Sequence, residues 1–384
     1  MTSRLPSQAR RTASDEPALG RRGPLIGTEL VSPEISGSGR RRRIALLLLQ
    51  SFLGLGLLIA RVRLVDLSSV AGRLAAMQWP FVVVALGLGL LAYLARTARW
   101  RLLLRPIARL PLGDIIPIVF ASTLINFLLP LRTGELARSL LLKQRRGVTV
   151  AGSLATVAVD RAFDLAIVLA LAAVGAVLVP TGASLGPGWG LVGLGFLLAF
   201  ATLIVLAWKG RISKLLGVGL RVFPPRLRPA VHAATLRFLE GLSTTARAPR
   251  ILAPAIGLSA LALALDSGAF YMLLVGVGGH PDPRLAALGY ALFVLTFLIP
   301  AAPGYVGTAE AFGSLVFVGI GLPVDVASSA VLLSHATNAV LVLVLGLIGF
   351  AGIGLRPAAA VRAVLGEKGD GRLGGTEAPA QPAP

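Results

Sequence analysis

Residues 126–142 read NFLLPLRTGELARSLLL, and residues 296–317 read TFLIPAAPGYVGTAEAFGSLVF. Each stretch has an apolar run that ends at a proline, a break of small residues, a glutamate and a second apolar run. The spacing from proline to glutamate is five residues in the first copy and ten in the second. Paired proline- and glycine-interrupted apolar segments in the two halves of a chain are typical of the binding sites of membrane transporters.

The composition places both stretches in a lipid bilayer. The residues AVILMFWYC make up 55% of the 384 residues, charged residues make up 14%, and the mean hydropathy is +0.81. Soluble domains carry roughly 25% charged residues. Inside a bilayer, backbone polar groups must be satisfied within helices or at breaks that are buried in protein. We therefore expect an all-α polytopic membrane protein.

The cysteine count, the histidines and the charge pattern exclude several other classes. The chain has no cysteine, so disulfides, iron–sulfur clusters and thiolate metal sites are excluded, and its three histidines lack metal-ligand spacing. We expect no metal and no cofactor. The net charge of +20 does not indicate nucleic-acid binding, because the basic residues flank apolar spans. That pattern sets membrane orientation and attracts anionic lipid.

Basic flanks and apolar lengths predict about six full transmembrane helices within a domain at 40–355. Residues 1–39 and 356–384 are expected to be disordered cytoplasmic tails, so both termini are cytoplasmic. The loop 209–250 contains nine basic residues and one acid. It should therefore be cytoplasmic, with an amphipathic helix on the inner leaflet. Residues 64–78 should form another interfacial helix. The expected spans are Ile44–Ala60, Trp79–Ala95, Val150–Val179, Leu191–Trp208, Ile251–Val277 and Val326–Leu355.

Residues 112–142 are too short for two crossings. After Gly134, only Glu135–Leu142 precede the basic run that begins at Lys143. These eight helical residues rise about 12 Å, against a hydrocarbon core of roughly 30 Å. The segment therefore predicts a re-entrant helical hairpin that opens to the cytoplasm. A second hairpin, predicted at 285–320, opens to the outside because three crossings separate the two. The result is an inverted repeat, with halves at about 79–208 and 251–355.

Three ordered motifs resemble a known family. PLRTGELARSLLL at 130–142, ATVAVDRAFDLAIV at 155–168 and IPAAPGYVGTAEA at 299–311 resemble the flippase-like family of the lysylphosphatidylglycerol synthase transmembrane region. The resemblance covers about residues 44–355. It implies a fold similar to a lipid flippase, with re-entrant helices that meet at the midplane. We expect the chain to be a multi-pass protein of the cytoplasmic membrane of a bacterium. It does not identify the substrate.

The densest group of charges within a predicted span is Asp160, Arg161 and Asp164. Asp160 and Asp164 share a helix face, and Arg161 can pair with Asp164 three residues later. Charges at this depth cost about 2.5–3.5 kcal/mol each. Two interpretations stay open, which are a substrate or proton site and a neutralised cluster that locks this span to its neighbours.

The first break offers a second set of candidates. Arg132 lies at the predicted tip of the hairpin, beside free N–H groups of a half-helix that starts at about Thr133, and together they could bind a lipid phosphate. The alternative is a shallower hairpin from which Arg132 snorkels to the interface. Glu135 and Arg138 could neutralise each other. Asn126, Pro130 and Gly134 are the expected structural residues of this break.

The second break contains Pro300, Pro303, Gly304, Tyr305 and Gly307. Glycines there allow close backbone approach, and Tyr305 could lie near a lipid head group. Glu310 is the repeat mate of Glu135, and we expect it to be protonated or paired with Arg132 or Arg161. The sequence favours a packing role for His335 over a proton relay.

Three functions are compatible with these features. The leading hypothesis is a protein that is not an enzyme and that binds or translocates an anionic phospholipid or a lipid-linked intermediate. The second is a glycosyl- or phosphotransferase that acts on a polyprenyl lipid, which would need carboxylates at a membrane face and usually a divalent metal. The third is a scaffold for a partner lipid-modifying enzyme. A homo-oligomer is compatible with all three.

Overall fold

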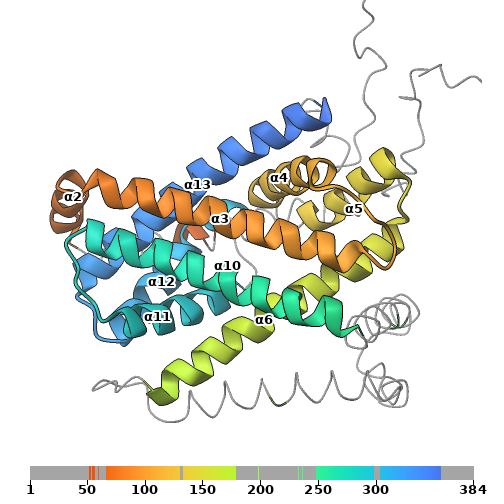
Figure 1. Cartoon of the computed structure of the whole chain (residues 1–384). Helices are drawn as coiled ribbons and strands as arrows, with labels where there is room; N and C mark the ends of the chain where they lie inside the picture. The colour runs from red at the N-terminus through yellow and green to blue at the C-terminus, as the bar shows by residue number, and fades with distance from the viewer. Residues whose placement is uncertain are drawn as a thin grey trace, which may run out of the picture.

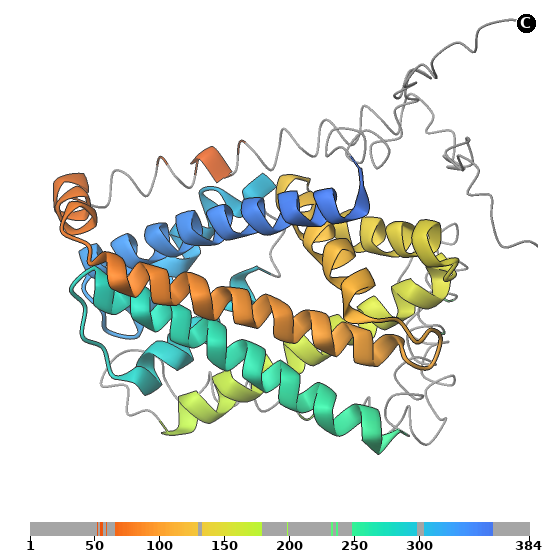
Figure 2. The ribbon, with the colours of Figure 1, turned by 45° about the horizontal axis from the view of Figure 1, so that its top comes forward.

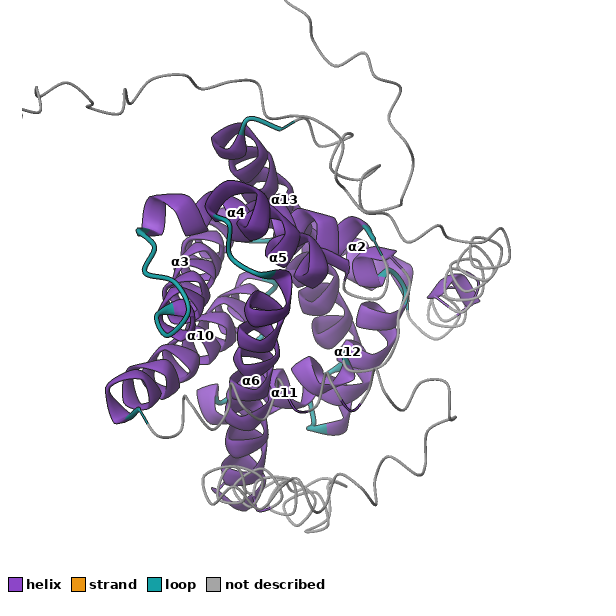
Figure 3. Cartoon of the chain, turned by 90° about the vertical axis from the view of Figure 1, so that its right-hand side faces the viewer, coloured by secondary structure: helices purple, strands orange, loops and turns teal. Residues whose placement is uncertain are grey.

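The computed structural model is helical throughout the part of the chain that it describes, which is 66–129, 133–178, 248–297 and 303–355 with a few single positions elsewhere (Figures 1 and 3). These residues contain no strand. The helices, in chain order, are α2 (Leu67–Ala75), α3 (Trp79–Leu104), α4 (Leu112–Leu128), α5 (Thr133–Arg146), α6 (Val150–Leu178), α10 (Pro249–Gly276), α11 (Pro283–Thr296), the 3-10 turn η2 (Pro303–Tyr305), α12 (Thr308–Gly319) and α13 (Val324–Ile353).

Three of the described helices, α3, α10 and α13, are long and apolar enough to cross a membrane. They contain 26, 28 and 30 residues, which rise about 39–45 Å and exceed a hydrocarbon core of roughly 30 Å. Helix α6 has 29 residues but carries the charged group at Asp160–Asp164. Helices α5, α11 and α12 have only 12–14 residues. The chain is therefore a membrane-integral helical protein.

Helices α3 and α10 form an antiparallel pair through the middle of the molecule (Figures 1 and 2). At one end, the backbone N–H of Gln78 donates to the carbonyl of Gly276 at 3.0 Å. Further along, the side chain of Arg99 reaches Ser259 on α10. Thus the start of α3 lies beside the end of α10.

A glycine stripe on α13 packs against α4. A Cβ atom added to Gly346 would lie 2.3 Å from the Cβ of Leu124, and one added to Gly349 would lie 2.4 Å from the backbone N of Ala121. Small residues on one face let membrane helices approach closely enough for their backbones to touch. The two helices run antiparallel, because Gly352 meets Pro117, nearer the start of α4.

Helices α4 and α5 form the first hairpin. An ion pair between Asp114 in the first turn of α4 and Arg146 in the last turn of α5 joins its two ends. Arg145 also donates from Nη2 to the carbonyl of Gly352 at 3.3 Å, near the end of α13. Both ends of this hairpin therefore lie beside the C-terminal end of α13.

Helices α11 and α12 form the second hairpin, and their contact is tight. Gly289 on α11 faces Phe317, and Gly313 on α12 faces Phe293. Phe317 also stacks on Phe270 of α10, with ring centroids 4.4 Å apart. The two ends of this hairpin join the C-terminus of α10 and the N-terminus of α13 through short connections.

Helix α2 connects the C-terminal end of α10 to the N-terminal end of α13. Arg73 forms an ion pair of 2.6 Å with Asp325 in the first turn of α13, and its Nη1 donates to the carbonyl of Val277 after α10. Asp66 caps the N-terminus of α2, and hydrogen bonds from the side chains of Ser68 and Ser69 lower the pKa of Asp66 to about 2. The helix expected within 64–78 is therefore present.

The structure corrects one predicted boundary. The span expected at Trp79–Ala95 continues as α3 to Leu104, so Arg96, Arg99 and Arg101 are helical residues and not a flank beyond the span. The extension is possible because acidic residues on α6 and α10 neutralise Arg99 and Arg96. Other predictions lie largely or wholly outside the described residues, namely the spans at Ile44–Ala60 and Leu191–Trp208, the loop 209–250 and both tails.

Candidate functional site

A cavity of about 640 Å³ lies where the two hairpins meet the long helices. Its lining comes from α3, α4, α5, α6, α10, α11, η2, α12 and α13. Ligand-binding pockets commonly have volumes of about 300–1,000 Å³. Apolar side chains such as Phe127 and Leu263 share the lining with charged ones, so the cavity can take a ligand that has both kinds of surface.

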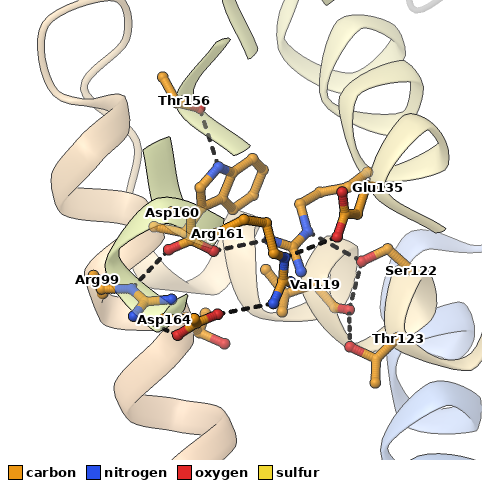
Figure 4. A network of polar contacts seen from close by, with 12 residues as sticks. Arg99, Val119, Ser122, Thr123, Glu135, Thr156, Asp160, Arg161 and Asp164 are labelled. Carbon is orange, nitrogen blue, oxygen red and sulfur yellow. Dashed lines mark hydrogen bonds and ion pairs between the residues drawn. The ribbon is translucent and has the colours of Figure 1, made fainter. Parts of the chain in front are cut away.

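Arg99 on α3 is the buried centre of the ionic network (Figure 4). Its Nε lies 2.7 Å from Asp160, and its Nη1 lies 2.7 Å from both Asp164 and the hydroxyl of Ser259. The side chain has no exposed surface, and its Nη2 has no hydrogen-bond partner among the described residues. Arg99 therefore joins α3, α6 and α10 at a position that water does not reach.

Arg161 on α6 is the more open cation of the network. Its Nη1 donates to Asp164 at 2.9 Å, as the sequence predicted, and its Nε lies 2.8 Å from Glu135. The approach to Glu135 is an ion pair without hydrogen-bond alignment. The side chain is 34% exposed and lines the cavity. Two carboxylates thus fix its orientation while about a third of the side chain stays accessible.

Arg138 on α5 also lines the cavity, and its described ion-pair partner is Asp160 and not Glu135, which the sequence offered as a partner. It lies 3.7 Å from Asp160, donates from Nε to Ser122 at 3.3 Å, and lies 4.9 Å from the ring centre of Trp100. Glu135 pairs with Arg161 instead, because α5 packs against α6.

Arg96 is a second basic residue of the site that the sequence analysis missed. It pairs with Asp266 on α10, and both residues line the cavity. Together with Arg99, Arg138 and Arg161 it makes four arginines, which face the four carboxylates of Glu135, Asp160, Asp164 and Asp266. The described network is therefore formally neutral. The described residues contain no group of three His, Asp or Glu that could hold a metal ion.

The second break is built from unusual backbone. Gly304 has φ 67° and Tyr305 has φ 60°, both in the left-handed region. Among the described residues, Tyr305 is the one residue other than glycine that has a positive φ. Gly307 has φ 80°, and a Cβ there would lie 1.8 Å from the carbonyl oxygen of Gly54. Only glycine fits such a conformation and approach without strain. The close backbone approach and the non-helical dihedrals expected of these glycines are observed, while their expected part in substrate binding stays a prediction.

Glu310 and His335 hold this break in place. Glu310 accepts a hydrogen bond of 2.7 Å from the backbone N–H of Gly307, and its other oxygen contacts Nδ1 of His335. The Nε2 of His335 lies 2.6 Å from the carbonyl oxygen of Gly304. Of the two expected states of Glu310, protonated or paired, the structure shows a paired one, and its described partner is His335 and not Arg161. Both ring nitrogens of His335 have partners, as expected of a hydrogen-bonded packing residue.

The tip of the first break is described only in part. Arg132, Pro130 and Pro300 lie outside the described residues, while Pro303 begins η2. Gly134 is a close-contact glycine, because a Cβ there would lie 2.2 Å from the carbonyl oxygen of Ser122. Contrary to expectation, the side-chain oxygen of Asn126 does not accept a hydrogen bond from any described backbone N–H group of the break. This buried atom has no hydrogen-bond partner in the described part of the chain.

These features define a class, which is a helical membrane-integral protein with a neutral ionic network around a central cavity. Residues 44–346 match the family described as the lysylphosphatidylglycerol synthase TM region. The match covers most of the chain, and the chain belongs to this family. This family is the membrane domain of lysylphosphatidylglycerol synthase-like proteins, which indicates a membrane protein with a lipid-related function. No curated protein matches the chain.

Proposed function

We propose that this protein binds an anionic phospholipid or a lipid-linked intermediate in the cavity and moves it across the cytoplasmic membrane. The observation that carries the proposal is Arg161, a cation held by two carboxylates with part of its surface facing a partly apolar cavity. A guanidinium presents planar paired donors that suit phosphate. The apolar lining suits the glycerol and acyl part of the same molecule.

Exchange of partners allows phosphate to bind in a neutral network. Glu135 is 23% exposed and lies near the N-terminus of α5. A lipid phosphate that displaces Glu135 from Arg161 keeps the arginine paired and lies beside the free N–H groups of that helix. Arg99, Asp160 and Asp164 stay paired throughout, because Arg99 is fully buried. The inner ions therefore support the fold while the outer pair exchanges.

The ends of the two hairpins support an inverted, re-entrant arrangement. The first hairpin has both ends beside the C-terminus of α13, and the second has both ends beside the N-terminus of α13. Since α13 is long enough to cross the membrane, the hairpins then open to opposite sides.

Matched pairs of residues support the same symmetry. Glu135 pairs with Arg161, 26 residues later, and Glu310 pairs with His335, 25 residues later. Each break thus has a glutamate bound to a basic residue on the following long helix. Arg96 and Asp266, which are 170 residues apart, pair with each other between α3 and α10. Two hairpins that enter from opposite sides and share one cavity suit alternating access.

Single-cysteine labelling tests the arrangement, because the chain has no native cysteine. We expect Arg109→Cys and Lys143→Cys, at the two ends of the first hairpin, to react with an impermeant maleimide from the cytoplasmic side. Pro281→Cys and Pro323→Cys, at the two ends of the second, should react from the outside. Labelling of the two ends of one hairpin from opposite sides would overturn the re-entrant arrangement.

Arg161→Ala tests the lipid site. A hydrogen bond to a charged group contributes about 1.5–3 kcal/mol, so loss of Arg161 should weaken binding of labelled phosphatidylglycerol roughly 10- to 100-fold. Arg161→Lys should be intermediate because lysine lacks the planar paired donors. The measurements are lipid binding to purified protein and lipid movement in reconstituted vesicles.

Two further variants complete this test. Arg105→Gln is the control, since Arg105 is exposed beyond α3 and is not among the residues that line the cavity. The double variant Glu135→Gln with Arg161→Gln removes one charge of each sign, so it leaves no unpaired carboxylate at this pair. Binding as strong as the parent's in both Arg161→Ala and the double variant would contradict the proposed site.

A further inference from the structure

We propose that the Glu310–His335 pair is a proton-binding site whose protonation closes the turn at 303–307 and whose deprotonation opens it during lipid movement. This inference rests on the proposed function, to which it adds a driving ion. The site lies on α12 and α13, and its His335 lines the same cavity as Glu135 and Arg161.

The acceptor at Gly304 fixes one proton of His335. A carbonyl oxygen can only accept, so Nε2, at 2.6 Å from the carbonyl oxygen of Gly304, must carry hydrogen and donate. The remaining ring nitrogen, Nδ1, faces a carboxylate oxygen of Glu310. Without a further proton, a nitrogen lone pair would face an anionic oxygen. The contact therefore needs one shared proton, carried by the imidazole or by the carboxyl group.

Loss of that proton has a structural consequence. The pair changes from neutral to a charge of −1, and the contact between α12 and α13 becomes repulsive. The same two side chains hold the break, because Glu310 also accepts from the N–H of Gly307 and His335 donates to Gly304. The backbone they restrain is left-handed at Gly304, Tyr305 and Gly307. Release of one proton thus leaves the ring of His335 with one N–H for two acceptors, so the ring can no longer hold both Glu310 and the carbonyl of Gly304.

The proton has a route to water through the cavity. His335 and Gly304 line it, and the side chains of His335 and Glu310 are 13% and 12% exposed. A buried pair with slight access can exchange protons without being solvated. Histidine suits this role, since its charge changes in the range of physiological pH.

Other charges around the pair already have partners. Arg96 on α3 pairs with Asp266 on α10, and Arg73 on α2 pairs with Asp325 at the far end of α13. Within the described residues, neither Glu310 nor His335 makes an ion pair with any third side chain. Polar and aromatic groups that line the cavity from neighbouring elements include Asn126, Phe127, Tyr290, Tyr305 and Tyr93, whose hydroxyl donates to Asn338.

The test uses Glu310→Gln, which reproduces both contacts without a titratable proton. The amide oxygen can accept from Gly307, and the amide N–H can donate to Nδ1 of a neutral His335. This variant should stay closed at every pH. His335→Ala removes both ring contacts and should stay open. Lipid movement by the parent protein should rise about tenfold between about pH 5 and pH 8 as the pair titrates. Both variants should be insensitive to pH, with Glu310→Gln slow and His335→Ala fast.

An opening assay that needs no lipid separates this inference from the proposed function. Val306 lies in the second break and is 49% exposed, so the rate at which Val306→Cys reacts with maleimide reports the opening. Leu136→Cys, on α5 and 44% exposed, corrects for the pH dependence of thiol reactivity. We expect the ratio of the two rates to rise with pH in the parent and to stay flat in Glu310→Gln.

Each result has a defined meaning. A ratio that does not change with pH in the parent overturns the proton site, even if lipid moves. A ratio that rises with pH, in a protein that moves no tested lipid at any pH, supports the proton site and contradicts the proposed function. If Glu310→Gln titrates as the parent does, another group binds the proton and the assignment is wrong.

Discussion

Replacing Arg99 by alanine should remove most of the folded protein. Arg99 has no exposed surface and is the cation nearest both Asp160 and Asp164. Asp160, only 2% exposed, would keep one distant partner, Arg138 at 3.7 Å. Breaking a buried ion pair by removing one partner costs about 3–5 kcal/mol. The loss should appear as a fall in monodisperse protein by size exclusion and a lower melting temperature in detergent.

Three comparison variants sharpen the expectation for Arg99. Combining Arg99→Met with Asp160→Asn removes the unpaired charge and should restore part of the yield. Arg161→Ala should be milder, because its side chain is 34% exposed and Asp164 keeps Arg99. Arg105→Ala, in the exposed segment after α3, should be neutral. A melting temperature of Arg99→Ala equal to that of the parent would show that Asp160 and Asp164 reach water.

Gly134→Ala should separate the helices of the first hairpin. The added Cβ would lie 2.2 Å from the carbonyl oxygen of Ser122 and 2.7 Å from the backbone N of Asn126. These are backbone atoms of α4, which cannot move aside as a flexible side chain can. Overpacking typically costs about 1–3 kcal/mol, and we expect the upper end of that range or more. Thermal unfolding and lipid binding should both be impaired.

The matched control is Gly113→Ala in the first turn of α4. A Cβ there meets nothing within 4 Å, so the change should be neutral or stabilising by up to about 1 kcal/mol through helix propensity. If the two variants unfolded at the same temperature, α4 and α5 would not be in the close contact described.

The breaks could be located from sequence because their causes are local. Proline and glycine interrupt helices whatever surrounds them. The return half-helix was expected at about Thr133, where α5 begins, and the expected pair between Arg161 and Asp164 needs only helical spacing. The number of crossings could not be fixed in the same way, since hydropathy does not distinguish a buried half-helix from a span.

The central arginine could not be found from local rules. Arg96, Arg99 and Arg101 follow an apolar run, which is also the pattern of a cytoplasmic flank. Whether these arginines form a flank or pair inside the helix bundle depends on acidic residues that are 61 and 170 residues away in sequence. One signal was present, because Arg161 satisfies Asp164 and leaves Asp160 without a local cation. The spacing of 26 residues between Glu135 and Arg161, applied to Glu310 in the second repeat, falls within one residue of His335.

Placing one half of an ion pair on each of two distant helices has a consequence for biosynthesis. Ribosomes add about 5–20 residues per second, so α3 is made several seconds before Asp160 of α6 and about ten seconds or more before Asp266 of α10. During that interval Arg96 and Arg99 have no partner, and a lone charge in lipid is costly. We therefore expect the nascent α3 to stay in an aqueous or protein-lined site of the insertion machinery until α6 has been made. Its release into the bilayer would then follow the synthesis of Asp160 and Asp164.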